Sequence, residues 1–194
     1  MDPALPWSDW ALLPPALELI EAEVDAGRRE VVECGSGVST IAIARRLAAV
    51  GDGRLCALEH DRGWAAEIRG RIEAEGLAGR ARVIEASLGE HPLARPGCRW
   101  YSQAALADLP ASGIELLLVD GPPAGDPGLE RSRYPALPAL ADRLAGDALV
   151  VLDDIDRPGE QWVLGAWERE TDFRFERSPD LRLAIGRRPR PASA

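Results

Sequence analysis

The sequence contains no lysine and no asparagine, so all 23 basic residues are arginine. Such a composition is typical of a GC-rich genome. It has one chemical consequence, because an arginine side chain stays protonated and does not replace lysine as a general base. The chain therefore excludes mechanisms that need a lysine base or a lysine Schiff base.

Cysteine is scarce, and no long hydrophobic run is present. Cys34 and Cys56 fall in apolar, strand-like runs and are predicted to be core residues, while Cys98 lies in an irregular segment. No CxxC motif and no Cys/His spacing of the metal-binding kind occurs. No stretch approaches the length of a membrane span, and residues 1–10 lack the features of a signal peptide. We expect a protein of the reducing cytoplasm.

Positive charge is in short supply, and the net charge is −9. This balance argues against nucleic acid as a partner, because phosphate neutralisation needs a basic surface. It disfavours anionic membrane surfaces for the same reason. The length of 194 residues and the hydrophobic content of 46% fit one globular domain with a sizeable core.

Strands and helices alternate along most of the sequence. Apolar runs predict strands, and helical spacing of apolar residues predicts helices. The expected order is helix 14–26, strand 30–34, helix 38–50, strand 55–59, helix 62–75, strand 82–86, strand 114–119, helix 134–144, strand 148–152 and helix 160–168. Segments 173–176 and 181–185 alternate with period two around Ser178-Pro179-Asp180, which predicts an antiparallel hairpin.

This order predicts an α/β fold with a doubly wound, mostly parallel, seven-stranded sheet that ends in an antiparallel hairpin. We expect one domain over residues 1–194, with an N-terminal helical cap at 1–28, a core at 29–187 and a loose tail at 188–194. The segment 87–110 is less regular, and the sequence shows no internal repeat.

The most informative stretch runs from Val31 to Thr40 and reads VVECGSGVST. It predicts a buried strand that ends in the acid Glu33 and turns through Gly35 and Gly37 into a helix. Glycine permits a tight turn and a close approach of a ligand to the backbone. A dinucleotide fingerprint would have a third glycine where Thr40 stands, so this turn suits a ligand without a pyrophosphate.

Acids lie at the ends of four of the predicted strands, namely Glu33, Glu59, Asp120 and Asp153. In an open α/β sheet the ligand lies beyond the carboxyl ends of the strands. Four carboxylates at one edge repel one another unless a cation or a donor-rich ligand joins them. Glu59 also lies close to the spacing at which an acid reaches ribose hydroxyls.

The glycine turn resembles the first motif of the class I S-adenosylmethionine (SAM)-dependent methyltransferases, and the terminal hairpin matches the Rossmann-like fold of that class. The resemblance covers roughly residues 7–187. It implies that Glu59 takes the cofactor ribose and that Asp120 lies beside the cofactor. The remaining residues that it places around SAM are Glu33, Gly35, Ser36, Gly37, Ser39, Thr40, His60, Asp61 and Ser87. A helix N-cap is the alternative role for Asp61, and an ordinary turn for Ser87.

Further motifs resemble a group of small bacterial class I methyltransferases that supplies no substrate: Trp100-Tyr101, Asp120-Gly121-Pro122-Pro123, and Asp153-Asp154 with Arg157 and Glu160. Catechol-type O-methyltransferases are similar more distantly. That resemblance implies a divalent ion, Mg²⁺ or another, on Asp120, Asp153 and Asp154, which would then be catalytic. Ion pairs with Arg131, Arg133 or Arg157 are the alternative. Pro123 stands where those enzymes place a catalytic lysine.

The remaining candidates are a general base and an aromatic lid. His91 is a candidate catalytic base, although a histidine in an irregular segment is more often a surface residue. The resemblance to class I methyltransferases implies that the segments with Trp7, Trp10, Trp100 and Tyr101 could cover the mouth of the site, whereas Trp64, Trp162 and Trp167 are expected to pack on helices.

The sequence therefore predicts a SAM-dependent methyltransferase for a small-molecule acceptor, with metal-assisted O-methylation as one form of the reaction. The oligomeric state, the acceptor and the choice between O- and N-methylation cannot be read from it. An aminopropyltransferase and a non-catalytic SAM-binding domain are the alternatives on the same fold. Thr40 argues against a nicotinamide-dependent dehydrogenase.

Overall fold

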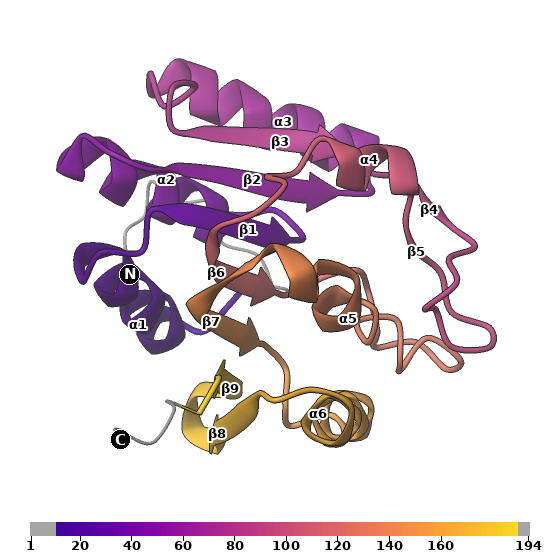
Figure 1. The fold of residues 1–194 in the computed structure, drawn as a ribbon. Coiled ribbons are helices and arrows are strands. Elements are labelled where there is room, and N and C mark those ends of the chain that lie inside the picture. The colour runs from indigo at the N-terminus through magenta and orange to yellow at the C-terminus, as the bar shows by residue number, and fades with distance from the viewer. Residues whose placement is uncertain (1–10, 190–194) are drawn as a thin grey trace.

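A computed structural model describes residues 11–189, and a seven-stranded sheet forms its centre (Figure 1). The strand order is β3-β2-β1-β6-β7-β9-β8, with β9 antiparallel to both of its neighbours and the other pairs parallel. The strands are β1 (Glu30–Cys34), β2 (Arg54–Glu59), β3 (Ala81–Glu85), β6 (Ile114–Val119), β7 (Leu144–Leu152), β8 (Arg174–Ser178) and β9 (Leu183–Arg187). The predicted fold class is confirmed.

Helices cover both faces of the sheet and make a three-layer structure (Figure 1). One face carries α1 (Pro14–Asp25), α2 (Val38–Val50) and α3 (Arg62–Ala74), and the other carries α4 (Gln103–Ala107), α5 (Ala136–Leu140) and α6 (Pro158–Glu170). Successive strand residues point to opposite faces. In β6, Leu116 and Leu118 therefore pack in the core on the side of α1, α2 and α3. Leu117 and Val119 pack in the core on the side of α4, α5 and α6.

The strand order reverses beside β1, and this positions the site. From β1 the chain proceeds outward through β2 to β3, whereas β6 pairs with the opposite edge of β1 and leads to β7. Connections leave the neighbouring carboxyl ends in opposite directions, so a crevice opens between them. The acids predicted at the strand ends lie along this edge.

The structure differs from the prediction mainly where tertiary contacts fix the local conformation. The expected helix 134–144 is shorter, because α5 passes into a 3₁₀ turn, Ala141–Arg143, before β7 begins at Leu144. Segment 87–110 holds a short antiparallel pair, β4 (Leu88–Gly89) with β5 (Trp100–Tyr101), and helix α4. The hairpin turn is a second 3₁₀ turn, Pro179–Leu181.

Helix α1 belongs to the packed layer of the first face. Its buried residues Ala16, Ile20 and Val24 join a core with α2 and α3. None of the described helices is both long and apolar enough to cross a bilayer. Cys34 and Cys56 are buried, as predicted for core residues.

Candidate active site

A cleft of about 1000 Å³ lies over the carboxyl ends of β1, β2, β6 and β7. A second pocket of the described chain, beside Arg54 and Arg80, has a volume of about 360 Å³. Nine of the residues predicted for the site line the cleft over the strand ends: Gly35, Ser36, Gly37, Ser39, Glu59, His60, Asp61, Asp120 and Asp154. These side chains come from segments far apart in the sequence, and the fold brings them together.

Three predicted residues lie behind the cleft wall instead. Glu33, Thr40 and Asp153 are buried and do not line the cavity. Asp153 nevertheless stands beside Asp120 and Asp154, so it belongs to the same acidic group. Glu33 and Thr40 support the turn that borders the cleft.

Ser87 and His91 also do not line the cleft. The Ser87 side chain is exposed, and its carbonyl accepts a hydrogen bond from the Ser102 amide at 3.0 Å. In His91, Nδ1 accepts from the Leu93 amide and Nε2 lies 3.2 Å from the Gln103 amide nitrogen. Contacts with Leu93 and with Gln103 in α4 thus hold the His91 ring, and its role as a catalytic base stays a prediction.

The turn after β1 depends on glycine for two reasons. Gly35 has φ of +97°, a left-handed conformation that side chains disfavour. Backbone atoms also pack closely here, since a Cβ on Gly121 would lie 2.9 Å from Gly35 Cα and 2.7 Å from the Tyr101 hydroxyl oxygen. By contrast, a Cβ on Gly37 would meet no atom within 4 Å. The backbone at Gly37 therefore borders open space in the cleft.

The buried Glu33 carboxylate organises the start of α2. Its carboxylate accepts hydrogen bonds from the Ser39 hydroxyl and, at 2.7 Å, from the Thr40 hydroxyl. The Thr40 hydroxyl in turn accepts from the Gly37 amide at 2.9 Å. Burial raises the pKa of Glu33 to about 7, although both hydroxyls oppose the shift. Thr40 thus closes the turn where a dinucleotide site would have glycine.

Glu59 presents a fixed, ionised carboxylate to the cleft. Its Oε1 accepts from the Asp61 amide at 2.8 Å and lies 2.9 Å from His60 Nδ1, and its Oε2 accepts from the Ser36 hydroxyl at 3.0 Å. Burial works against ionisation, but the hydrogen bonds from His60, Asp61 and Ser36 outweigh it and lower the pKa. The hydrogen bond to Glu59 raises the pKa of His60.

Asp61 and Trp64 form the wall of the cleft at the start of α3. Asp61 is the N-cap of that helix, and its carboxylate accepts from the Trp64 amide at 2.7 Å. The Trp64 indole donates to the Ser36 carbonyl at 2.7 Å and lines the cleft. The expectation that Trp64 only packs on its helix missed this role. Helical position alone did not reveal it, because the partner lies 28 residues away.

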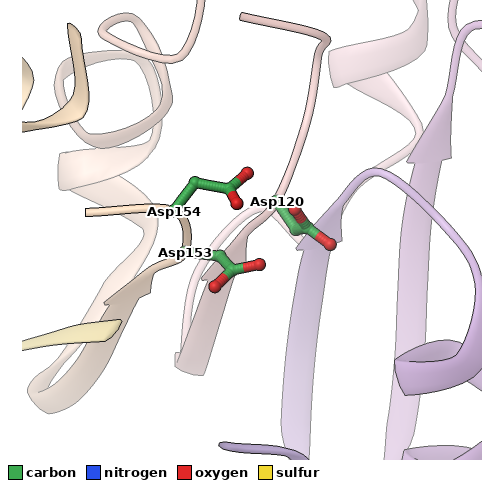
Figure 2. Close-up of side chains that lie close together, drawn as sticks. All are labelled: Asp120, Asp153 and Asp154. Carbon is green, nitrogen blue, oxygen red and sulfur yellow. The ribbon is translucent and has the colours of Figure 1, made fainter. Parts of the chain in front are cut away.

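Three carboxylates meet where β6 and β7 end. Asp120 follows β6, while Asp153 and Asp154 follow β7, and one oxygen from each lies within 4.8 Å of the others (Figure 2). Asp154 has φ of +61°. Neither carboxylate oxygen of Asp153 has a hydrogen-bond partner among the described residues, although the side chain is buried.

Arg133 places a buried guanidinium against this group. Its Nη2 lies 3.0 Å from Asp154 Oδ2 and 3.3 Å from Asp120 Oδ1, and its Nη1 lies 3.7 Å from Glu160 Oε1. It also donates to the backbone carbonyls of Asp120, Pro122 and Asp153 over 3.0–3.3 Å. Arg157 adds a second, more exposed ion pair to Asp154 Oδ2 at 2.8 Å.

The charged side chains of this group shift one another's pKa values. Burial and the neighbouring Asp153 raise the pKa of Asp120 well above its usual range, although Arg133 opposes the shift. Burial and Asp154 raise the pKa of Asp153 to about 6, and burial raises that of Glu160 to about 7. Burial disfavours the charged form of Arg133, but Asp120, Asp154 and Glu160 outweigh it and raise its pKa. The guanidinium thus stays charged among acids that are easily protonated.

Of the aromatic residues considered for a lid, Trp7 and Trp10 lie outside the described residues. Trp100 is fully buried in the core, whereas the buried Tyr101 borders the cleft. Trp167 packs in the same core, and Trp162 is partly buried against it, in line with the predicted packing role.

Comparison with known proteins identifies the family of the chain. A family model described as a methyltransferase domain matches residues 32–155, from β1 to the loop after β7. The chain therefore has the architecture of the class I, SAM-dependent methyltransferases, as the sequence predicted. It belongs to the methyltransferase-domain family.

Solved structures with the same fold include several methyltransferases. The O-methyltransferase from Bacillus cereus, solved with S-adenosylhomocysteine (SAH), is 16% identical with a TM-score of 0.68, over 94% of this chain and 84% of that one. The O-methyltransferase TomG from Streptomyces achromogenes, solved with SAM, is 18% identical with a TM-score of 0.63, over 92% and 82%. No curated protein sequence matches the chain.

Proposed function

We propose that the protein transfers the methyl group of SAM to a small-molecule acceptor bound in the same cleft. The observation that carries the proposal is the glycine turn of β1 facing the fixed Glu59 carboxylate across one cavity. The cavity of about 1000 Å³ is at the upper end of the range of small-molecule sites. It is lined by carboxylates, which suits neither nucleic acid nor an anionic membrane.

The residues present fit SAM. Open space at Gly37 lets the ligand approach the backbone, and Ser39 lines the cleft beside it. Glu59 Oε2 keeps one lone pair for a ribose hydroxyl, because a carboxylate accepts about four hydrogen bonds and three are used here. Asp61 and Trp64 would border the adenosine. Bound SAM supplies an electrophilic methyl group on a sulfonium.

The acceptor would occupy the other half of the cleft. Its walls are the segment 122–126 after β6, Glu130, and the start of α6 with Arg157 and Glu160. Methyl transfer from a sulfonium needs alignment of the acceptor atom more than covalent catalysis, so walls that orient the acceptor are sufficient. Glu160, with its pKa near 7, is the group here that changes protonation most easily at neutral pH.

Divalent-metal assistance is a second form of this proposal. The three carboxylates of Asp120, Asp153 and Asp154 within 4.8 Å, and the unpaired oxygens of Asp153, favour it. Arg133 opposes it, because its guanidinium binds the Asp154 and Asp120 oxygens that an ion would need. The donor set does not fit an ion while Arg133 is in place, and we therefore propose methyl transfer without a metal.

Calorimetric titration with SAH, with and without Mg²⁺, tests the proposal. We expect a micromolar dissociation constant, about −8 kcal/mol, that Mg²⁺ does not change. Incubation with methyl-labelled SAM and a metabolite extract, in excess chelator, should then label a small molecule. Absence of SAH binding would reject the proposal. SAH binding without transfer of the label would favour a non-catalytic domain. Transfer of an aminopropyl group from decarboxylated SAM would favour an aminopropyltransferase. Loss of activity in chelator would favour the metal-assisted form.

A further inference from the structure

The Arg133 guanidinium is buried and makes more contacts than the guanidinium of an ordinary surface ion pair. Its side chain is 4% exposed, and its three nitrogens contact three backbone carbonyls and three carboxylates. The carbonyls of Asp120 and Pro122 belong to the loop after β6, and that of Asp153 follows β7. The guanidinium therefore lies at the junction of the two loops that form the acceptor half of the cleft.

The position of Arg133 Nη2 competes directly with a metal ion. Oxygen ligands lie about 2.0–2.6 Å from Mg²⁺ or Ca²⁺. An ion bound to Asp120 Oδ1 and Asp154 Oδ2 would occupy the space between those oxygens, and Nη2 is 3.3 and 3.0 Å from them. Ion and guanidinium would overlap there and repel each other.

A second observation shows that the carboxylates retain capacity for a cation. Asp153 is 1% exposed, yet neither of its oxygens has a hydrogen-bond partner in the described structure. One of these oxygens lies within 4.8 Å of the Asp120 and Asp154 ligand atoms. Buried, unpaired carboxylate oxygens are unfavourable unless a positive charge compensates them. The guanidiniums of Arg133 and of Arg182, which lies 3.5 Å from Asp154 Oδ1, supply that charge. Both oppose the rise that burial causes in the pKa of Asp153.

We propose that Arg133 is a built-in cation that replaces a divalent ion, and that it keeps the carboxylate cluster free of metal. Arg133 is thus a positioning residue, which fixes the two loops through its contacts with their carbonyls and carboxylates. The inference deepens the proposed function: acceptors would not be selected by bidentate chelation of a metal. A single hydroxyl or amine on an acceptor would be enough.

The test is metal binding, which does not depend on catalysis. Mn²⁺ alone is titrated into the wild type, Arg133→Ala and Arg133→Gln, with binding followed by electron paramagnetic resonance and by melting temperature. We expect no saturable site in the wild type. Both variants should gain one saturable Mn²⁺ site, with an affinity at least tenfold higher than the nonspecific binding of Mn²⁺ to the wild type. Their melting temperature should rise with the Mn²⁺ concentration. Adding Asp153→Asn to Arg133→Ala should abolish the gain.

Arg157→Ala is the matched control, since it removes the other arginine on Asp154 Oδ2 but leaves Arg133 in place. It should gain no site. A saturable wild-type site that Asp153→Asn removes would overturn the inference, as would folded Arg133 variants without a gain. If both variants unfold without metal, recovery of folding in Mn²⁺ supports the inference and failure to recover overturns it. SAH binding by the same wild-type sample tests the proposed function separately.

Discussion

The Ser36 hydroxyl donates a hydrogen bond to Glu59 Oε2 over 3.0 Å and thereby joins the turns that follow β1 and β2. Ser36 also accepts from the Trp64 indole through its carbonyl oxygen. One residue of the glycine turn thus contacts both the carboxylate proposed for the ribose and the aromatic wall beside it. The cofactor half of the cleft is therefore preorganised before any ligand binds.

Replacing Glu59 with glutamine should weaken SAH binding 10- to 100-fold. The substitution removes an ionised acceptor, and hydrogen bonds to charged groups contribute about 1.5–3 kcal/mol. Calorimetry measures the change. Glu85→Gln is the control, because Glu85 ends the neighbouring strand β3 and its ion pairs within residues 11–189 are with Arg62 and Arg69. Equal affinities for both variants would contradict the role proposed for Glu59.

Trp64 should report ligand binding by its fluorescence. Its indole lines the cleft, whereas Trp100 and Trp167 are buried in the core. SAH should change the emission of the wild type, and Trp64→Phe should lose most of this change. The same variant loses the hydrogen bond to the Ser36 carbonyl, at a cost of about 1 kcal/mol in unfolding free energy. A full ligand response in Trp64→Phe would place the ligand elsewhere.

Stability should fall as the pH rises from about 5 to 8. The pKa of Glu33 is about 7 in the folded protein and 4.5 in its ordinary state, so the folded state binds more protons across this window. The shift corresponds to about 3 kcal/mol of unfolding free energy. This contribution is fully present below pH 4.5 and is lost as the pH rises through about 7. Asp153 and Glu160 act in the same direction.

Urea unfolding of the wild type and Glu33→Gln at several pH values checks this dependence. The variant should show a flatter profile, because glutamine does not titrate and its amide can still accept from Thr40. A wild type that becomes more stable between pH 5 and 8 would show that Glu33 is not the dominant titrating group.

Gly159→Ala should destabilise the protein by about 2 kcal/mol or more through a clash with backbone. A Cβ at this position in α6 would lie 2.2 Å from the Glu130 carbonyl oxygen. Gly165→Ala in the same helix would meet only the flexible end of Arg169 at 3.2 Å. That control should be neutral or stabilising by up to about 1 kcal/mol, as for alanine against glycine in helices. Thermal unfolding of both variants gives the comparison.

The sequence predicted the fold well because each signal was local. The apolar run of β1 and the period-two hairpin each follow from a few consecutive residues, and glycines mark several helix ends. The acids at Glu59 and Asp120 were predictable for the same reason, since a strand end fixes where its last residue lies. Segment 87–110 was not predictable, because β4 and β5 are short and depend on each other.

The central role of Arg133 was not visible in the sequence. The sequence indicates it only as one of three arginines that could pair with the acids after β7. Its six partners come from the loops after β6 and β7 and from α6, so no spacing rule could single it out. His91 shows the opposite case: its residue type predicts a base, but its ring contacts Leu93 and Gln103 and is not among the groups that line the cleft.

The charge of the cleft lining has a kinetic consequence. Among the described residues, the side chains lining the cleft include carboxylates from Glu59, Asp61, Asp126 and Glu130, and the guanidiniums there are outnumbered. SAM carries a net positive charge and SAH does not, so the field of this lining would speed the encounter of the methyl donor but not of its product. Turnover would therefore slow with rising ionic strength through the on-rate of the donor.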